Sequence, residues 1–230
     1  MVMMRKYIIF LLLFNFVLPV RPDSLEATQL LWAKDLQAQE YRDRMKIPSV
    51  TLYETMLNFT VKEDYEKVSK SVPFIHEILE VIKAKFEVDL EKELKTALEN
   101  KEKELIILTI RKTIFYDMKD LFSILISTET IAEQSTVRLR TFIRTGYLDY
   151  LLLSPKIKEK EFKTDLTLKK VFQRVFYLIG ATSPYAVEEK TTEKAPTIVD
   201  WNAVSKELNV IEKEILHLFP EFKPPEKKKE

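Results

Sequence analysis

The chain has 230 residues, of which 46% are hydrophobic and 32% charged, and it contains no cysteine. This is the composition of a folded globular protein, and without cysteine it excludes disulfide bonds, thiolate nucleophiles, zinc–thiolate sites and iron–sulfur sites. Basic residues number 37 and acidic residues 36, which gives a formal net charge of +1. Nucleic-acid binding requires a basic surplus, so we expect no nucleic acid as a partner.

The first 24 residues have the pattern of an export signal. Arg5 and Lys6 precede an almost unbroken apolar run over residues 7–20. The run is shorter than the roughly 20 apolar residues of a membrane-spanning helix. The residues that follow it fit a signal-peptidase site poorly, so an uncleaved N-terminal anchor remains an alternative. We therefore expect an exported protein that is periplasmic, extracytoplasmic or anchored through residues 1–24.

Behind this leader the apolar residues recur at helical spacing almost throughout, which predicts an all-α fold. Only two glycines are present, so β-hairpins and glycine-rich phosphate loops are not expected. We predict a bundle of five to seven helices with a tethered C-terminal helix. In chain order the predicted helices cover residues 24–46, 51–57, 73–98, 105–126, 130–154, 165–179 and 201–219.

Two of these predicted helices have distinctive patterns. Residues 73–98 begin with a proline suited to a first turn and continue with apolar residues at spacings of three and four, which predicts one long amphipathic helix. Residues 105–126 are apolar around most of their circumference, which predicts a central helix covered by its neighbours.

Changes of composition also divide the chain into segments. A bundle domain is expected over residues 25–180, including a charged connector at residues 156–164. A linker of low apolar content follows at residues 181–198. The C-terminal helix, residues 199–219, carries the apolar stripe of an amphipathic helix, and residues 220–230 form a charged tail.

A narrow polar stripe on the predicted central helix suggests a binding site. The candidate ligand-binding residues are this stripe's Tyr116, Asp117 and Asp120, together with Arg138, Arg140 and Arg144 of the next helix. Because buried charges must be paired, an aspartate could meet an arginine inside the bundle, in a pocket for an apolar or anionic ligand. The alternative, which we favour, is that the stripe is a solvent-exposed face.

The two histidines are the candidate metal ligands. Glu214 and His217 have the E-x-x-H spacing of di-iron helical bundles, which need that motif twice. His76, the other histidine, lacks an acid three residues before it. The simpler interpretation is that both histidines are ordinary helix residues.

We therefore predict a non-enzymatic protein that acts by binding or assembly, and no cofactor. Its expected partner is another protein or a second copy of itself, and a membrane surface could be reached through the N-terminal segment. A helical carrier of an apolar or anionic small ligand is the first alternative, and a metal-dependent enzyme is a remote one.

Overall fold

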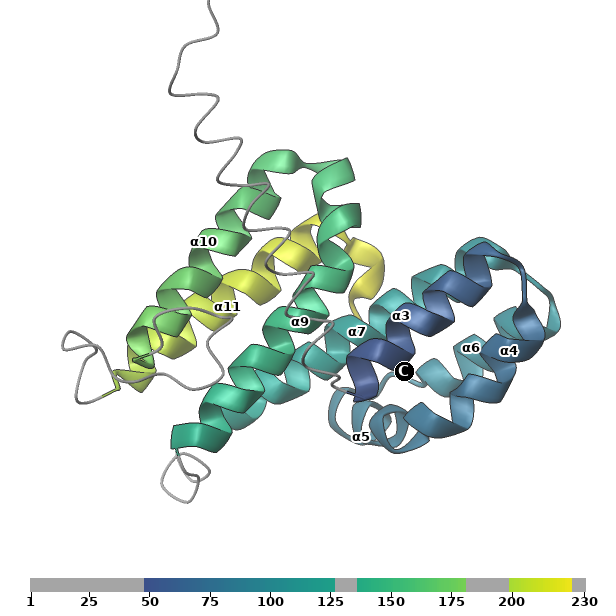
Figure 1. The fold of residues 1–230 in the computed structure, drawn as a ribbon, viewed down its shortest axis with the longest axis horizontal. Coiled ribbons are helices and arrows are strands. Elements are labelled where there is room, and N and C mark those ends of the chain that lie inside the picture. The colour runs from purple at the N-terminus through teal and green to yellow at the C-terminus, as the bar shows by residue number, and fades with distance from the viewer. Residues whose placement is uncertain (1–47, 127–135, 181–198, 225–230) are drawn as a thin grey trace, which may run out of the picture. The chain divides into compact units, whose positions relative to one another are not determined.

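The computed structural model describes residues 48–126, 136–180 and 199–224 (Figure 1). The predicted leader, the predicted helix at residues 24–46 and the predicted linker at residues 181–198 lie outside the described residues. For residues 136–139 only the backbone is described.

The described residues form helices joined by short turns, which confirms the all-α prediction. None of their helices is long and apolar enough to cross a bilayer. In chain order the elements are α3 (Pro48–Val61), α4 (Tyr65–Ser71), the 3-10 helix η2 (Val72–Ile75), α5 (His76–Phe86), α6 (Leu90–Glu99), α7 (Lys103–Ile126), α9 (Thr136–Lys160), α10 (Phe162–Leu178), α11 (Trp201–Leu218) and the 3-10 helix η3 (Pro220–Phe222).

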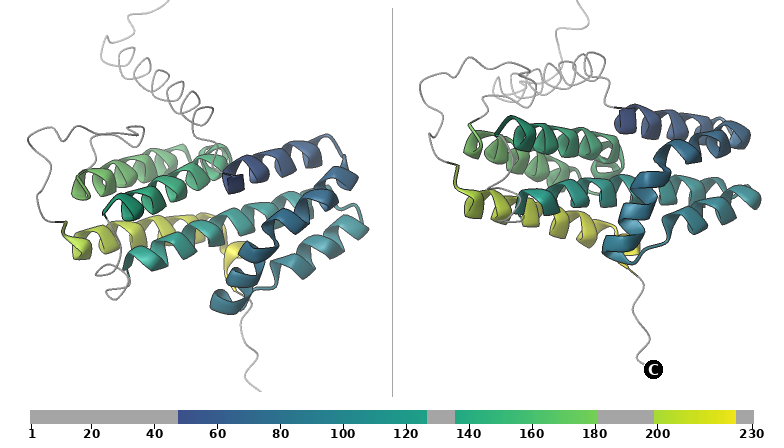
Figure 2. Two further views of the ribbon diagram at one scale, coloured as in Figure 1. Left: turned by 60° about the horizontal axis from the view of Figure 1, so that its bottom comes forward. Right: turned by 90° about the horizontal axis from the view of Figure 1, so that it is seen from below.

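Helix α7 is the central helix, as its apolar circumference predicts. It packs against α3, α5, α6, α9 and α11 (Figures 1 and 2). Its contact with α9 is the most extensive, and Gly146 of α9 explains how closely the two helices approach. A Cβ atom at residue 146 would lie 2.7 Å from Cε1 of Phe122 on α7. The missing side chain therefore makes room for the Phe122 ring.

The predicted single helix at residues 73–98 is wrong, because the chain breaks into α5 and α6. Glu87 ends α5 in the left-handed conformation, with φ of 58°. The Asp89 carboxylate then accepts a hydrogen bond from the Lys92 backbone N–H at 3.1 Å, which caps the start of α6. The break brings α6 back against α5, although the apolar spacing continues across it.

The predicted end of a helix at residue 154 is also wrong. Helix α9 continues through the exposed Pro155 to Lys160. An internal proline removes one backbone hydrogen bond, but Leu153 and Ile157, one turn apart, are buried on the same face. Their burial favours continuation of the helix, and the predicted charged connector shrinks to the turn at Glu161, between α9 and α10.

The C-terminal helix α11 belongs to the packed bundle. Its predicted apolar stripe is buried at Val204, Leu208, Ile211 and Ile215, and the helix packs mainly against α10. The following η3 is packed as well. Phe222 is fully buried there, whereas the sequence places it in a charged tail. Residues 225–230 of that predicted tail lie outside the described residues.

Candidate functional site

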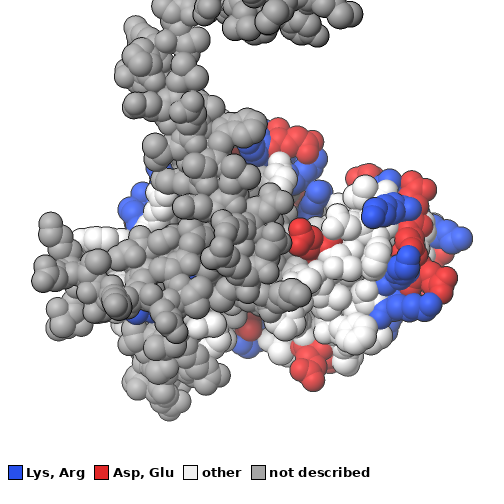
Figure 3. Space-filling view, viewed as in Figure 1, with Lys and Arg blue, Asp and Glu red and all other residues white. Residues whose placement is uncertain are grey.

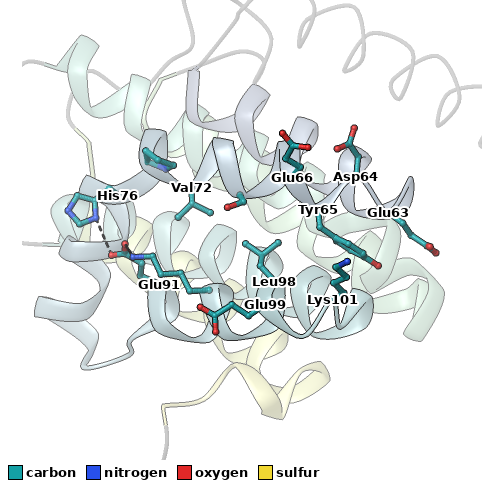
Figure 4. A pocket seen from close by; sticks show the side chains of 13 residues that line it. Glu63, Asp64, Tyr65, Glu66, Val72, His76, Glu91, Leu98, Glu99 and Lys101 are labelled. Atoms are coloured by element: carbon teal, nitrogen blue, oxygen red, sulfur yellow. Dashed lines mark hydrogen bonds and ion pairs between the residues drawn. The ribbon is translucent and has the colours of Figure 1, made fainter.

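A groove of about 870 Å³ lies between α4 and η2 on one side and α6 on the other (Figure 4). Val72 of η2 and Leu98 of α6 point toward one another across it, and Tyr65 of α4 adds an aromatic ring. The carboxylates that line the groove are Glu63, Asp64, Glu66, Glu91 and Glu99, and the lining ammonium groups are Lys95 and Lys101. The groove therefore combines a partly apolar floor with a charged rim.

Four of the rim carboxylates, those of Glu63, Asp64, Glu66 and Glu91, form ion pairs with lysines. Asp64 accepts a hydrogen bond from Lys67 Nζ at 2.6 Å, and Glu63 from Lys103 Nζ at 3.1 Å. The bond from Lys67 lowers the pKa of the Asp64 carboxyl below its usual value. Figure 3 shows the resulting mixture of both charges over α4 and α6. Exposed ion pairs of this kind contribute about 0–1 kcal/mol to stability, so another cation can replace the lysine at little cost.

His76, Glu80 and Glu91 come together at one end of the groove. His76 opens α5, Glu80 follows one turn later, and Glu91 lies in the first turn of α6. The Nδ1 atom of His76 is 3.1 Å from Glu91 Oε2 (Figure 4). One potential ligand atom from each of the three side chains lies within 4.8 Å of the others. Imidazole nitrogen and carboxylate oxygen are both zinc ligands in proteins.

Glu91 also has a competing partner. Lys95 Nζ lies 2.6 Å from Glu91 Oε1, the carboxylate oxygen that does not contact the histidine. The hydrogen bond from Lys95 is the main cause that lowers the pKa of Glu91, and the hydrogen bond with His76 lowers it further. The Glu91 carboxylate is therefore charged at neutral pH.

A second group of acids lies in the core, where α3, α7 and α9 meet. Tyr53 of α3 is fully buried and donates a hydrogen bond from its hydroxyl to Asp117 Oδ2 of α7 at 2.8 Å. Asp149 of α9 is also fully buried, and neither of its carboxylate oxygens has a hydrogen-bond partner among the described residues. Burial, together with repulsion from Asp120, raises the pKa of Asp117 to about 6, although the hydrogen bond from Tyr53 lowers it. Burial, followed by repulsion from Asp117, raises the pKa of Asp149 well above its usual value.

The polar stripe of the central helix is not the solvent-exposed face that the sequence favoured. Thr109 and Thr113 are fully buried, and each hydroxyl donates to the backbone carbonyl four residues earlier. Tyr116 is buried and donates to the Phe222 carbonyl at 2.7 Å, so it fastens η3 to the bundle. Asp120 is half-buried and forms an ion pair with Lys85 of α5.

The candidate arginines of α9 do not pair with the aspartates of α7 in the described residues. Arg140 donates from Nε to the Ile179 carbonyl at 3.1 Å and from Nη2 to the Gly180 carbonyl at 3.3 Å. Both acceptors lie at the C-terminal end of α10, where carbonyl groups lack helical partners. Arg144 is half-buried, and the side chain of Arg138 lies outside the described residues. The hydrogen bonds that the structure gives to Asp117 and Asp120 come from tyrosine and lysine, not arginine.

The sequence-predicted metal ligands do not meet. His217 is exposed in the last turn of α11, and Glu214 is half-buried one turn earlier. In the part of the chain that the structure describes, the group of side chains that could hold a metal contains His76 but neither of these two.

Sequence reasoning missed Tyr53, Asp149 and Glu91. A signal exists for Asp149, because it is the single acid in the apolar and aromatic stretch of α9 at residues 142–153. Glu91 has none, since it is one of several glutamates in α6 and nothing in the sequence distinguishes it from the others.

Comparisons with known proteins leave the site to be interpreted from its geometry. No protein-family model matches the chain, and no curated protein or solved structure was found to be similar to it.

Proposed function

We propose that this is an exported protein that acts by binding, and that the groove between α4–η2 and α6 is its binding surface. The observation that carries the proposal is the groove itself. Its volume of about 870 Å³ falls within the roughly 300–1,000 Å³ of small-molecule sites, which also combine apolar walls with a few polar groups. The leader pattern of residues 1–24 supports export.

The groove supports binding better than acid–base catalysis. A catalytic carboxyl that donates a proton near neutral pH needs a raised pKa. The carboxyl groups of Asp64, Glu66 and Glu91 are shifted in the opposite direction, each chiefly by a hydrogen bond from a lysine. They are suited to holding a cationic group.

We propose that the occupant carries an amine or guanidinium group beside an apolar part, as does a basic segment of a partner protein. The ammonium of such an occupant would replace the lysines that now pair with the rim carboxylates. Since exposed ion pairs contribute little, the exchange costs little. Val72 and Leu98 would receive the apolar part.

Two other interpretations have less support. The apolar stripe of α11 is buried against the bundle, so it is not offered to a partner. An anionic ligand inside the bundle would lie near Asp117, whose carboxyl is ionised above about pH 6 and would repel it.

Native mass spectrometry of the full chain, purified without denaturation from its own host, tests the proposal. Ser69→Trp places a bulky ring in the groove, whereas Thr96→Trp places the same ring on an exposed position of α6 outside the groove lining. We expect a bound species on the wild type and on Thr96→Trp, and none on Ser69→Trp. The chain mass reports in addition whether the leader has been removed.

Equal occupancy of both variants would contradict the assignment of the groove. A bare chain in all three samples would contradict the binding function. Circular dichroism of the two variants checks that both remain folded.

A further inference from the structure

We propose that His76, Glu80 and Glu91 form a binding site for a divalent transition-metal ion, such as zinc, at one end of the groove. The site goes beyond the proposed function, because it requires only these three side chains and would exist whether or not the groove takes a ligand.

The spacing of the two nearest groups fits a shared ion. Zinc lies about 2.1 Å from its nitrogen and oxygen ligands, so two ligands of a tetrahedral ion are roughly 3.4 Å apart. His76 Nδ1 and Glu91 Oε2 are 3.1 Å apart. A metal ion can therefore replace the hydrogen bond between them with only a small movement of either side chain.

Glu80 supplies the third ligand from the same helix as His76. The two residues are one helical turn apart, so their side chains extend from the same face of α5. Both are exposed, and a change of rotamer is enough to bring the Glu80 carboxylate from within 4.8 Å to coordination distance. The site is thus assembled from two helices whose relative position is fixed by the break at Glu87.

The chemistry of the ligands selects the class of metal. One imidazole nitrogen with two carboxylate oxygens suits zinc, nickel, cobalt or copper, whereas magnesium and calcium favour oxygen ligands alone. Two carboxylates neutralise the charge of a divalent ion. Three protein ligands leave a fourth position for water or for a group of a bound molecule, as in catalytic zinc sites.

Two features oppose the ion and limit the affinity. Lys95 holds the other oxygen of Glu91 at 2.6 Å, and its charge repels a cation. His76 and Glu91 also lie at helix N-termini, whose partial positive charge disfavours cations. We therefore expect a site that exchanges its metal rather than one that retains it through purification.

The chain offers a clean test because it has only two histidines and no cysteine. The full chain, freed of any affinity tag and treated with a chelator that is then removed, is titrated with zinc in a calorimeter at neutral pH. His76→Ala is compared with His217→Ala, which removes the other exposed imidazole. Both positions are exposed, so both variants are expected to fold.

We expect one zinc ion per chain for the wild type and for His217→Ala. His76→Ala should weaken binding by more than about 100-fold, since loss of a supporting group alone costs a metal site about 10- to 100-fold. Glu91→Gln, which keeps the shape of the side chain, should also weaken binding. Lowering the pH should release zinc, because protons compete for the imidazole.

Three results would overturn the inference. They are no zinc binding by the wild type, unchanged binding by His76→Ala, and loss of binding by His217→Ala, which would move the site to Glu214 and His217. None of them bears on the groove test, because Ser69→Trp leaves the three metal ligands in place.

Discussion

The carboxyl groups that line the groove and those where α3, α7 and α9 meet differ in their exposure to solvent, in their partners and in the direction of their pKa shifts. At the rim, Asp64 and Glu91 are reached by solvent and by lysines, and their pKa values are lowered. Where α3, α7 and α9 meet, Asp149 is fully buried and Asp117 is half-buried, and burial raises the pKa values of both. The same functional group is therefore ready to hold a cation at one place and resists ionisation at the other.

A third acid, Asp165, has more hydrogen-bond donors than either Asp117 or Asp149. Asp165 is fully buried, but its Oδ1 accepts hydrogen bonds from the hydroxyls of Tyr150 at 2.7 Å and Ser154 at 2.6 Å. Lys169 Nζ lies 3.2 Å from its other oxygen. Within the described part of the chain, Asp117 has one such donor, from Tyr53, and Asp149 has none. The three acids therefore differ in the number of polar partners that compensate the loss of water.

The largest expected effect comes from removing the charge in the core. The pKa of Asp117 rises from 3.8 to about 6 on folding, so the folded protein binds this proton more tightly than the unfolded chain. The group therefore reduces stability as the pH rises from about 4 to 6, and the loss persists above pH 6. We expect Asp117→Asn, which can still accept from Tyr53, to raise the free energy of unfolding by about 3 kcal/mol at pH 7.

Urea unfolding of wild type and Asp117→Asn at pH 4 and at pH 7 measures this effect. The gain should be present at pH 7 and nearly absent at pH 4, where the wild-type carboxyl is protonated. An equal gain at both pH values would show that charge is not its cause. Glu54→Gln, at an exposed position of α3, is the control and should change stability little.

Removing the donor to the same carboxyl should have a smaller, opposite effect. Tyr53→Phe keeps the ring but loses the hydroxyl that donates to Asp117 at 2.8 Å. A hydrogen bond to a charged group contributes about 1.5–3 kcal/mol, so we expect a loss near 2 kcal/mol at pH 7 and less at pH 4. Tyr65→Phe removes a hydroxyl beside the groove and should be close to neutral. Equal losses in the two variants would mean that the buried hydrogen bond has no special value.

The sequence predicted the core better than the candidate site, for a reason visible in α5 and α6. Burial of the α11 stripe at Val204, Leu208, Ile211 and Ile215 follows directly from its spacing. An apolar stripe indicates which face of a helix is buried. The same spacing can run through one continuous helix or through two helices separated by a turn. It therefore does not reveal a break such as the one at Glu87, where the stripe passes from α5 to α6.

The metal cluster depends on that break. His76 and Glu91 are 15 residues apart in the chain, and in one continuous helix they would be separated by roughly 22 Å. The turn between α5 and α6 brings the two side chains into contact. Only the Asp89 cap could have signalled the turn, and a single aspartate before a leucine is a weak signal. The acid pair in the core was hidden for a related reason, since Tyr53, Asp117 and Asp149 come from three different helices.

The smallest effect on stability should come from a substitution in the groove. The same substitution tests whether the carboxylates of the rim can exchange a lysine for another cation. Lys95→Met removes the ammonium that lies 2.6 Å from Glu91, and we expect the free energy of unfolding to change by less than about 1 kcal/mol. The same change should tighten zinc binding severalfold, because Glu91 loses its competitor and the site loses a repelling charge. Lys92→Met, an exposed lysine of α6 outside the groove lining, should leave both quantities unchanged. If Lys95→Met instead weakens zinc binding, then Lys95 holds the Glu91 carboxylate in position for the metal and does not compete with the metal for it. That result would also contradict the proposal that the rim carboxylates exchange lysine for another cation.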